Sequence, residues 1–229
     1  MDKQAVSQAL LNIYHRLLKR YEPRHWWPAK EPFEVIAGAI LTQAAAWSNV
    51  EKAIANLRES EALSARALRQ LSLPEIAGLI RPSGYYNAKA LKLKSFALWL
   101  ESYDDDLDKL FAGDIAPLRQ QLLSVHGIGE ETADSIILYA AGKPIFVIDA
   151  YTRRIISRIG LAPHGNNYSA YQSLFMDNLP ADVQLFNEYH ALLICLGKND
   201  CRNRPLCQHC CLNDICQFYI SLDAGSKVN

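Results

Sequence analysis

Apolar residues recur at helical spacing along most of the chain. Residues 1–20 predict an amphipathic helix, and residues 33–59 predict two helices that are separated near Ala45–Ser48. Only residues 143–149, with the sequence KPIFVID, have the composition of a strand, and this stretch is too short and too isolated to form a sheet. The pattern of the chain therefore predicts an all-α fold.

Residues that favour helix ends refine this prediction. Asn87 is expected to cap a helix over residues 88–100, because asparagine is a favoured N-cap. Residues 132–141 place their apolar side chains on one helix face. Residues 151–159 do the same, and Gly160 follows them as glycine often follows the last turn of a helix.

The composition narrows the class of protein. The chain has 229 residues, of which 50% are hydrophobic, and this is enough for one good core or two modest lobes. No apolar run approaches the roughly 20 residues that span a bilayer, and the N-terminus lacks the apolar region of a signal peptide. We expect a cytoplasmic protein without a membrane partner. The formal net charge of +0 does not exclude nucleic acid, because a neutral chain can still carry one basic face.

A cluster of cysteines near the C-terminus predicts a metal or iron–sulfur site. Five of the six cysteines lie in CRNRPLCQHCCLNDIC, and four of them have the spacing C-x5-C-x2-C-x5-C: Cys201, Cys207, Cys210 and Cys216. A disulfide knot is not expected without a secretory signal, whereas four thiolates in one short loop can bind a metal. Zinc sites usually have two C-x2-C pairs and this loop has one, so we favour a [4Fe-4S] cluster over zinc.

The stretch HGIGEETADS contains a glycine hairpin that could hold a phosphate. Gly127 and Gly129 flank Ile128 and allow a tight turn with outward main-chain N–H groups, to which the following helix adds its positive end. Further along the chain, Asp149 opens the helix over residues 151–159. Asp149 suits the role of an N-cap, and equally that of a carboxylate that stabilises a sugar cation or positions a water molecule.

Hairpin, helix, aspartate and four-cysteine loop, in this order, resemble the helix-hairpin-helix DNA glycosylase superfamily of endonuclease III over nearly the whole chain. The stretches AILTQAAAWSNVEKAIANL, IRPSGYYNAKALKLKSF and GIGEETADSIILYA…VIDAYTRR are similar to the 3-methyladenine DNA glycosylase III branch. The resemblance implies a six-helix barrel over residues 30–144, with the hairpin at residues 125–130. It also implies a second lobe, formed by residues 1–29 and 145–229, that carries the iron–sulfur cluster, and a base-recognition cleft between the lobes.

The resemblance also implies roles for single residues. Asp149 matches the catalytic aspartate, Gln43 matches the side chain that fills the gap left by a flipped base, and Tyr85 matches the wedge into the opposite strand. The hairpin residues Gly127, Ile128 and Gly129 would bind the DNA backbone. The damaged base would contact Trp26, Trp27, Pro28, Trp47 and Lys198. Each tryptophan could instead be a core residue, and Lys198 could instead be solvated or bind a phosphate.

Glu131 occupies the place where endonuclease III has its catalytic lysine. A carboxylate cannot form a Schiff base, so the sequence predicts a monofunctional glycosylase that leaves the DNA strand intact, although Glu131 would also suit the positive end of the helix. A cationic alkylpurine such as 3-methyladenine leaves easily and stacks well on electron-rich rings.

We therefore expect a monomeric base-excision repair glycosylase that removes alkylated purines from duplex DNA of the nucleoid. Two alternatives stay open. One is a glycosylase for a mispaired or deaminated base, and the other is an iron–sulfur protein that binds DNA lesions without catalysis.

Overall fold

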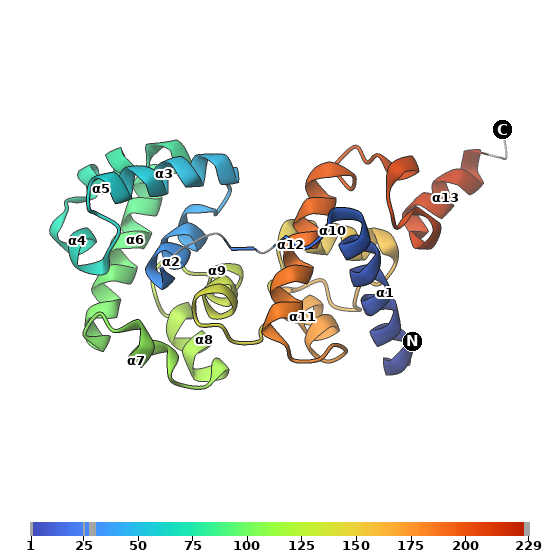
Figure 1. Ribbon diagram of the computed structural model, residues 1–229, viewed down its shortest axis with the longest axis horizontal. Helices are drawn as coiled ribbons and strands as arrows, with labels where there is room; N and C mark the ends of the chain where they lie inside the picture. Colours follow the sequence, from blue (N-terminus) through green and yellow to red (C-terminus); the bar gives the residue numbers. More distant parts are fainter. Residues whose placement is uncertain (1, 25, 28–30, 227–229) are drawn as a thin grey trace. The chain divides into compact units, whose positions relative to one another are not determined.

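The computed structural model describes residues 2–24, 26–27 and 31–226, and every regular element within them is helical. The chain divides into two compact units (Figure 1). One unit contains Met1–Trp26 and Pro144–Asn229, and the other contains Trp27–Lys143. The prediction of an all-α fold is confirmed. None of the described helices is long and apolar enough to cross a membrane.

The unit of Trp27–Lys143 is organised around α2. Its α-helices are α2 (Pro32–Leu41), α3 (Trp47–Glu59), α4 (Ala65–Gln70), α5 (Leu73–Leu79), α6 (Tyr86–Leu100), α7 (Leu107–Phe111), α8 (Ile115–Leu123) and α9 (Glu130–Ser135). Every residue of α2 from Val35 to Leu41 is buried, as expected of a helix that is apolar on all sides. α2 contacts α3, α6, α9 and the π-helical turn Ile136–Ala140 that continues α9. The predicted break between two helices in residues 33–59 is confirmed.

The start of α6 differs from the prediction. The helix begins at Tyr86, so Asn87 lies inside it and the prediction of Asn87 as the cap is wrong. A 3-10 turn (Arg81–Ser83) precedes the helix, and Gly84 and Tyr85 then take positive φ angles of 67° and 45°. The chain enters α6 through a left-handed turn, which suits glycine and is uncommon for a bulky residue such as tyrosine.

An ion pair joins the two helices that flank the glycine hairpin. Arg119 of α8 binds both carboxylate oxygens of Asp134 in α9, with Nε–Oδ1 and Nη2–Oδ2 distances of 2.7 and 3.2 Å. The Asp134 side chain is 0% exposed, and the Arg119 side chain is 23% exposed. Arg119 also contacts Glu130 at 3.4 Å. The hairpin is therefore fixed at its base by a bidentate pair that is partly shielded from water.

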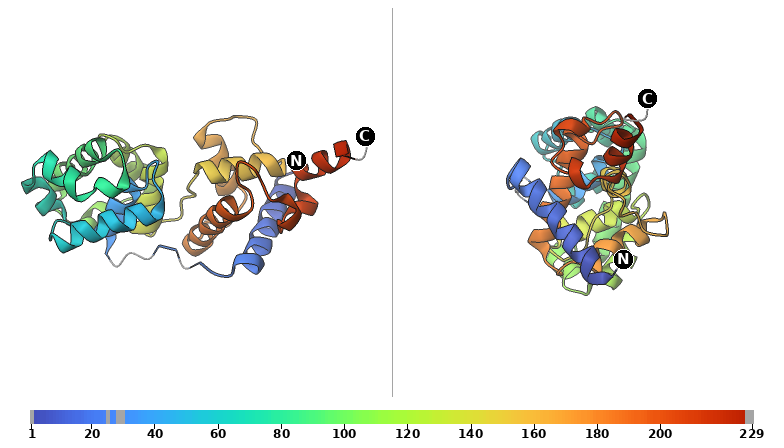
Figure 2. Two further views of the ribbon diagram at one scale, coloured as in Figure 1. Left: turned by 90° about the horizontal axis from the view of Figure 1, so that it is seen from above. Right: turned by 90° about the vertical axis from the view of Figure 1, so that its right-hand side faces the viewer.

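The other unit packs two segments that are distant in sequence (Figure 2). Helix α1 (Lys3–Tyr21) lies against α12 (Val183–Asn199), which also contacts α10 (Ala150–Ile159). The buried Tyr189 of α12 donates its hydroxyl to the Leu10 carbonyl at 2.8 Å. Helices α11 (Tyr168–Met176) and α13 (Gln217–Ser226) belong to the same unit. α10 ends at Gly160, whose φ is 96°, so this predicted helix end is confirmed.

Residues 143–149 have the composition of a strand but form none, which agrees with the prediction that they make no sheet, and Ile145–Ile148 are buried. Side chains of α11 satisfy the main chain of this segment instead of a neighbouring strand. The Tyr168 hydroxyl lies 3.2 Å from the Ile148 nitrogen, and the Gln172 amide donates to the Phe146 carbonyl at 2.8 Å. The segment leads directly to α10, so this packing helps to set where α10 begins.

The pair between Arg119 and Asp134 leads to a prediction about stability. Replacing Arg119 with methionine leaves the buried Asp134 carboxylate without its cation, and we expect the free energy of unfolding to fall by about 3 kcal/mol. Urea denaturation measures this difference. The matched control is Lys109→Met, which removes an exposed pair with Asp104 and should leave stability nearly unchanged. Equal effects of the two variants would contradict the proposed clamp.

Candidate active site

Asp149 is the N-cap of α10. Its Oδ1 accepts the main-chain N–H of Thr152 at 2.7 Å, and its backbone is extended, as is usual for a cap. The capping role that the sequence predicted is therefore confirmed. The side chain keeps 13% of its surface exposed, so it is largely but not completely removed from water.

His190 of α12 lies beside Asp149. Its Nε2 is 3.7 Å from the second carboxylate oxygen, Oδ2, and its side chain is only 6% exposed. Burial raises the pKa of Asp149, but the polar contact and positive charge of His190, together with the Thr152 N–H, lower that pKa by more. The net result is an Asp149 pKa below its ordinary value. The carboxylate is thus anionic and nearly buried at neutral pH.

The glycine hairpin presents its main chain rather than the side chain at its tip. Gly127 has a φ of 82°, in the region that favours glycine, and Gly129 is the N-cap of α9 with open space around its α-carbon. The Ile128 side chain is buried, and its N–H bonds to the Val125 carbonyl at 3.1 Å. A ligand at this hairpin would therefore meet main-chain groups and the positive end of a helix.

Gln43 and the hairpin share one hydrogen-bond network. The Gln43 amide donates to the Gly127 carbonyl at 3.2 Å and to the Thr132 hydroxyl at 3.0 Å. Its side-chain carbonyl accepts from the ammonium of Lys92 in α6. The Lys92 stem also covers Gly127 so closely that a β-carbon there would lie 2.3 Å from Lys92 Cγ. Within this unit, the structure brings together two of the predicted DNA-contacting elements.

Tyr85 projects from the left-handed turn before α6. Its relative exposure of 75% is the largest among the large exposed hydrophobic residues of the described chain. Because most of its surface is exposed, the ring contributes little to the core. Backbone strain such as that of this left-handed turn often marks a functional position.

Two of the predicted base-contacting tryptophans form an aromatic cluster with Tyr139. The ring centroids of Trp27 and Trp47 are 5.0 Å apart at 88°, and those of Trp27 and Tyr139 are 5.2 Å apart at 45°. Trp27 also packs on Gly38, where a β-carbon would lie 2.8 Å from the indole ring. These residues all belong to the unit of Trp27–Lys143, although the sequence placed Trp27 in the other lobe.

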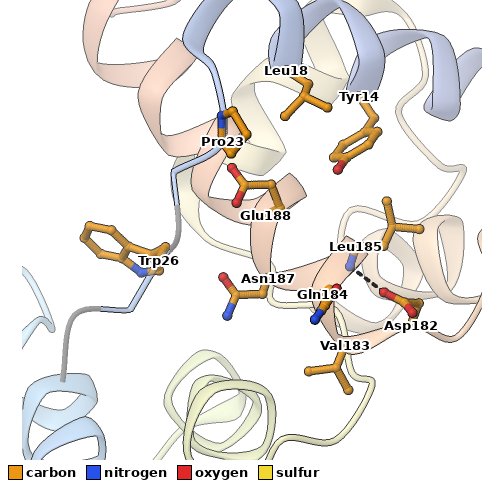
Figure 3. Close-up of a pocket in the computed structure, with 10 residues that line it drawn as sticks. All are labelled: Tyr14, Leu18, Pro23, Trp26, Asp182, Val183, Gln184, Leu185, Asn187 and Glu188. Carbon is orange, nitrogen blue, oxygen red and sulfur yellow. Dashed lines mark hydrogen bonds between the residues drawn. The ribbon is translucent and has the colours of Figure 1, made fainter. Parts of the chain in front are cut away.

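The remaining predicted base contacts are Trp26, Lys198 and Pro28. Trp26 belongs to the unit of Met1–Trp26 and Pro144–Asn229, where it lines a cavity of about 580 Å³ (Figure 3). The cavity is bounded by α1, the segment after α1 and the first turns of α12, and Glu188 accepts the main-chain N–H of Arg24 beside it. Lys198 is exposed in the last turn of α12. Pro28 lies outside the described residues.

The four cysteines predicted as ligands line one small cavity. This cavity is bordered by Cys201, Cys207, Cys210 and Cys216, while Cys195 and Cys211 do not border it. Arg158 of α10 fixes the loop around them, because it donates to the Arg202 carbonyl at 2.7 Å and approaches the Cys201 sulfur at 3.3 Å. Arg154 donates to the Cys201 carbonyl at 2.9 Å. Two arginines of the helix that Asp149 caps therefore shape the cysteine loop.

The thiols of this loop are half-buried. Burial raises the pKa of Cys207 and of Cys216, and the neighbouring cysteines raise both further. Among the described residues, no three His, Cys, Asp or Glu side chains converge closely enough to hold a single metal ion.

Sequence reasoning assigned no site role to two residues that contact the predicted site. The apolar helix face on which His190 lies favours a core or cleft-wall position, but a buried histidine needs a polar partner, and its Nε2 lies 3.7 Å from Asp149 Oδ2. Tyr139 was not singled out at all. Its signal was weak, because the π-helical turn that carries it changes which face of the helix it occupies.

Comparisons with known proteins agree with this arrangement. Residues 37–181 match the family model described as HhH-GPD superfamily base excision DNA repair protein. A putative DNA repair glycosylase of Methanocaldococcus jannaschii is 39% identical over 216 residues, which cover 93% of this chain and 98% of the relative.

Two solved structures are also similar. The H. pylori 3-methyladenine DNA glycosylase bound to 1,N6-ethenoadenine has a TM-score of 0.72 and 25% identity, covering 86% of this chain and 98% of that one. A non-covalent endonuclease III–DNA complex has a TM-score of 0.81 and 20% identity, covering 95% of this chain and 98% of that one. The family match spans more than half of the chain and includes both the glycine hairpin and Asp149. The chain therefore belongs to the HhH-GPD superfamily of base excision DNA repair proteins.

Proposed function

We propose that this protein is a monofunctional DNA glycosylase that removes alkylated purines from duplex DNA. The observation that carries the proposal is the state of Asp149, an anionic carboxylate held by the Thr152 N–H and by His190 with only 13% of its surface exposed. A carboxylate of lowered pKa is a poor general base, but it is well suited to stabilise a developing positive charge.

The reaction follows from this assignment. The bond between C1′ of the sugar and the purine nitrogen breaks, and its electron pair leaves with the base. For a cationic alkylpurine this electron pair neutralises the ring, so no proton has to be supplied to the leaving group. Asp149 stabilises the sugar cation, water adds to C1′, and the proton of that water passes to the solvent. The strand remains intact and carries an abasic site.

The first turn of α9 supports the monofunctional assignment. Glu131 is exposed there, at the position where endonuclease III has its lysine, and a carboxylate cannot form a Schiff base with the sugar. Its neighbour Glu130 contacts Arg119. Both acids also favour the positive end of the helix, so this turn offers no amine for a lyase step.

The aromatic residues support a purine as the substrate base. Trp27, Trp47 and Tyr139 provide electron-rich rings that favour a cationic base through cation–π attraction. The 25% identical H. pylori relative, which is a 3-methyladenine DNA glycosylase bound to 1,N6-ethenoadenine, supports a modified purine as the substrate base. We assign Trp26, Pro28 and Lys198 to base recognition as well, with Trp27 and Trp47 as the principal stacking partners.

Contacts with the DNA duplex are assigned to three elements. The main chain of Gly127–Gly129 binds a backbone phosphate without reading sequence. Gln43, which is hydrogen-bonded to that hairpin, fills the space of the flipped nucleotide, and the exposed Tyr85 wedges into the opposite strand.

The cysteine loop fits a [4Fe-4S] cluster. Such a cluster takes four thiolate ligands, and four cysteines, Cys201, Cys207, Cys210 and Cys216, border a common cavity in this loop. When bound, the cluster would cross-link the loop, with the four sulfur atoms as thiolate ligands. Arg158 and Arg154, which hold the same loop, would connect it to α10.

Base release from defined duplexes tests the proposal. DNA containing 3-methyladenine, uracil, hypoxanthine or an adenine mispair is incubated with the protein, and strand breaks are scored before and after alkali. We expect release of 3-methyladenine with breaks only after alkali. Release of a different base would discard the alkylpurine assignment, and breaks before alkali would discard the monofunctional one.

Asp149→Asn should lower the rate of base release by at least about a thousandfold, since the charge that stabilises the sugar cation is lost. Asparagine is also a good N-cap, so we expect the fold and the affinity for lesion DNA to persist. Single-turnover kinetics and a binding titration measure the two effects. Asp106→Asn, which alters the cap of α7, is the matched control and should leave the rate unchanged. A parallel loss of binding and rate would contradict a role of the Asp149 charge that is confined to the chemical step.

His190→Asn should move the acidic limb of the pH–rate profile to higher pH. The wild-type Asp149 pKa is lowered, so activity is retained above the ordinary aspartate value of about 3.9 and is lost only as pH falls through the lower folded value. Without His190, burial dominates and the carboxylate becomes protonated at a higher pH. The exposed His164 serves as a control in His164→Asn. An unshifted limb in His190→Asn would contradict the electrostatic role.

Metal analysis tests the cluster. Protein purified without oxygen should contain about four iron atoms and four sulfides per chain, with the broad visible absorbance of an iron–sulfur cluster. Cys207→Ser should lose this iron, whereas Cys195→Ser should retain it, because Cys195 does not border the cavity. Stoichiometric zinc without iron would contradict the assignment.

A further inference from the structure

Lys89 of α6 is a buried lysine that the proposed chemistry does not use. Its side chain is 2% exposed, and its ammonium donates to the main-chain carbonyls of Leu41 at 2.8 Å and Ser83 at 2.7 Å. Burial, and to a lesser extent the positive charge of Lys92, lowers the pKa of Lys89 to about 8, so the group still carries its charge at pH 7. A buried charge is costly, and an apolar side chain could fill the same space.

The two carbonyls occupy matching positions in the chain. Leu41 is the last residue of α2 and stands two residues before Gln43. Ser83 ends the 3-10 turn and stands two residues before Tyr85. One ammonium therefore connects the start of the loop that carries the proposed gap-filling residue to the start of the loop that carries the proposed wedge.

Both of these loops have strained backbones. Ala44, next to Gln43, has a φ of 51°, and Tyr85 has a φ of 45°. Residues other than glycine remain in this region only when the surrounding structure holds them there. The contacts of Lys89 supply a fixed point three residues before Ala44 and another two residues before Tyr85.

We propose that Lys89 is a positioning residue that sets the distance between Gln43 and Tyr85 by joining the two loops, so that both side chains can enter the duplex at one base step. This inference rests on the proposed function, because it takes the inserting roles of Gln43 and Tyr85 from it. Two side chains that separate one nucleotide from its partner must be spaced to match the stacked bases, and a displacement of about 1 Å can cost much of the rate.

Another lysine of the same helix provides a matched control. Lys94 donates its ammonium to a single main-chain carbonyl, that of Leu71 at the end of α4. Lys94→Met therefore removes the same chemical group from α6 without affecting either of the two loops. A general requirement for lysines that bind main-chain carbonyls would affect both variants alike.

The experiment uses the intact, cluster-loaded protein and a duplex with one 1,N6-ethenoadenine, whose fluorescence reports its departure from the base stack. The lesion is placed opposite thymine in one duplex and opposite a tetrahydrofuran abasic analogue in another. We expect Lys89→Met to slow base flipping about tenfold opposite thymine and less than about twofold opposite the analogue, where little stacking or pairing must be broken. Lys94→Met should match the wild type on both duplexes.

A general loss of structure would slow flipping equally on the two duplexes, and that result would overturn the inference. Thermal denaturation and the visible absorbance of the cluster establish that the variants are folded. If Lys89→Met does not fold, Lys89→Gln replaces it with the same expectations, because glutamine retains an N–H donor but has no charge and cannot reach both carbonyls.

A triple variant distinguishes an error in the role of Lys89 from an error in the inserting roles of Gln43 and Tyr85. In a protein that already carries Gln43→Ala and Tyr85→Ala, adding Lys89→Met should slow flipping no further, since Lys89 acts through those two side chains. A further tenfold loss would overturn the inference. If the Gln43→Ala and Tyr85→Ala protein flips the base at the wild-type rate, the proposed inserting roles themselves are wrong. If it is slow while Lys89→Met alone is not, only the role of Lys89 is wrong.

Discussion

Main-chain N–H and C=O groups at the ends of short helices need partners, and in this chain charged side chains supply several of them. Asp149 accepts the N–H of Thr152 at the start of α10, and Arg154 and Arg158 of the same helix bind carbonyls of the cysteine loop. Lys89 binds the last carbonyl of α2. The helices are too short to be stable alone, so these polar anchors fix where each helix begins and ends.

Because charged side chains fix the helix ends, some of them have both a structural role and a proposed functional role. The carboxylate that caps α10 is the one assigned to the sugar cation, so the helix that orients it also determines its charge state. The same helix carries Arg154 and Arg158, which bind the cysteine loop. The positions of this loop and of Asp149 therefore both depend on α10. In the other unit, Gln43 is hydrogen-bonded to Lys92 and to Gly127 of the hairpin, so the residues proposed for gap filling and for phosphate binding share one set of hydrogen bonds.

The sequence predicted what depends on local pattern. Helical periodicity identified the all-α fold, the break between α2 and α3 and the end of α10 at Gly160, and the cap at Asp149 followed from residue type. Prediction from the sequence failed where segments that are distant along the chain meet in the fold. The pairing of Asp149 with His190 and of Trp27 with Tyr139 depends on tertiary packing, which periodicity does not encode. The error at Asn87 arose because a left-handed turn at Gly84 and Tyr85 replaced the expected cap.

That turn has a consequence for how the sequence can vary over evolutionary time. Glycine or asparagine would adopt the backbone of residue 85 with less strain, and selection for stability alone would tend to replace the tyrosine. An exposed aromatic ring on a strained backbone is therefore retained only while binding to a partner selects for it. If a descendant of this protein lost its DNA partner, residue 85 would be among the first positions to drift, well before the buried lysine behind it.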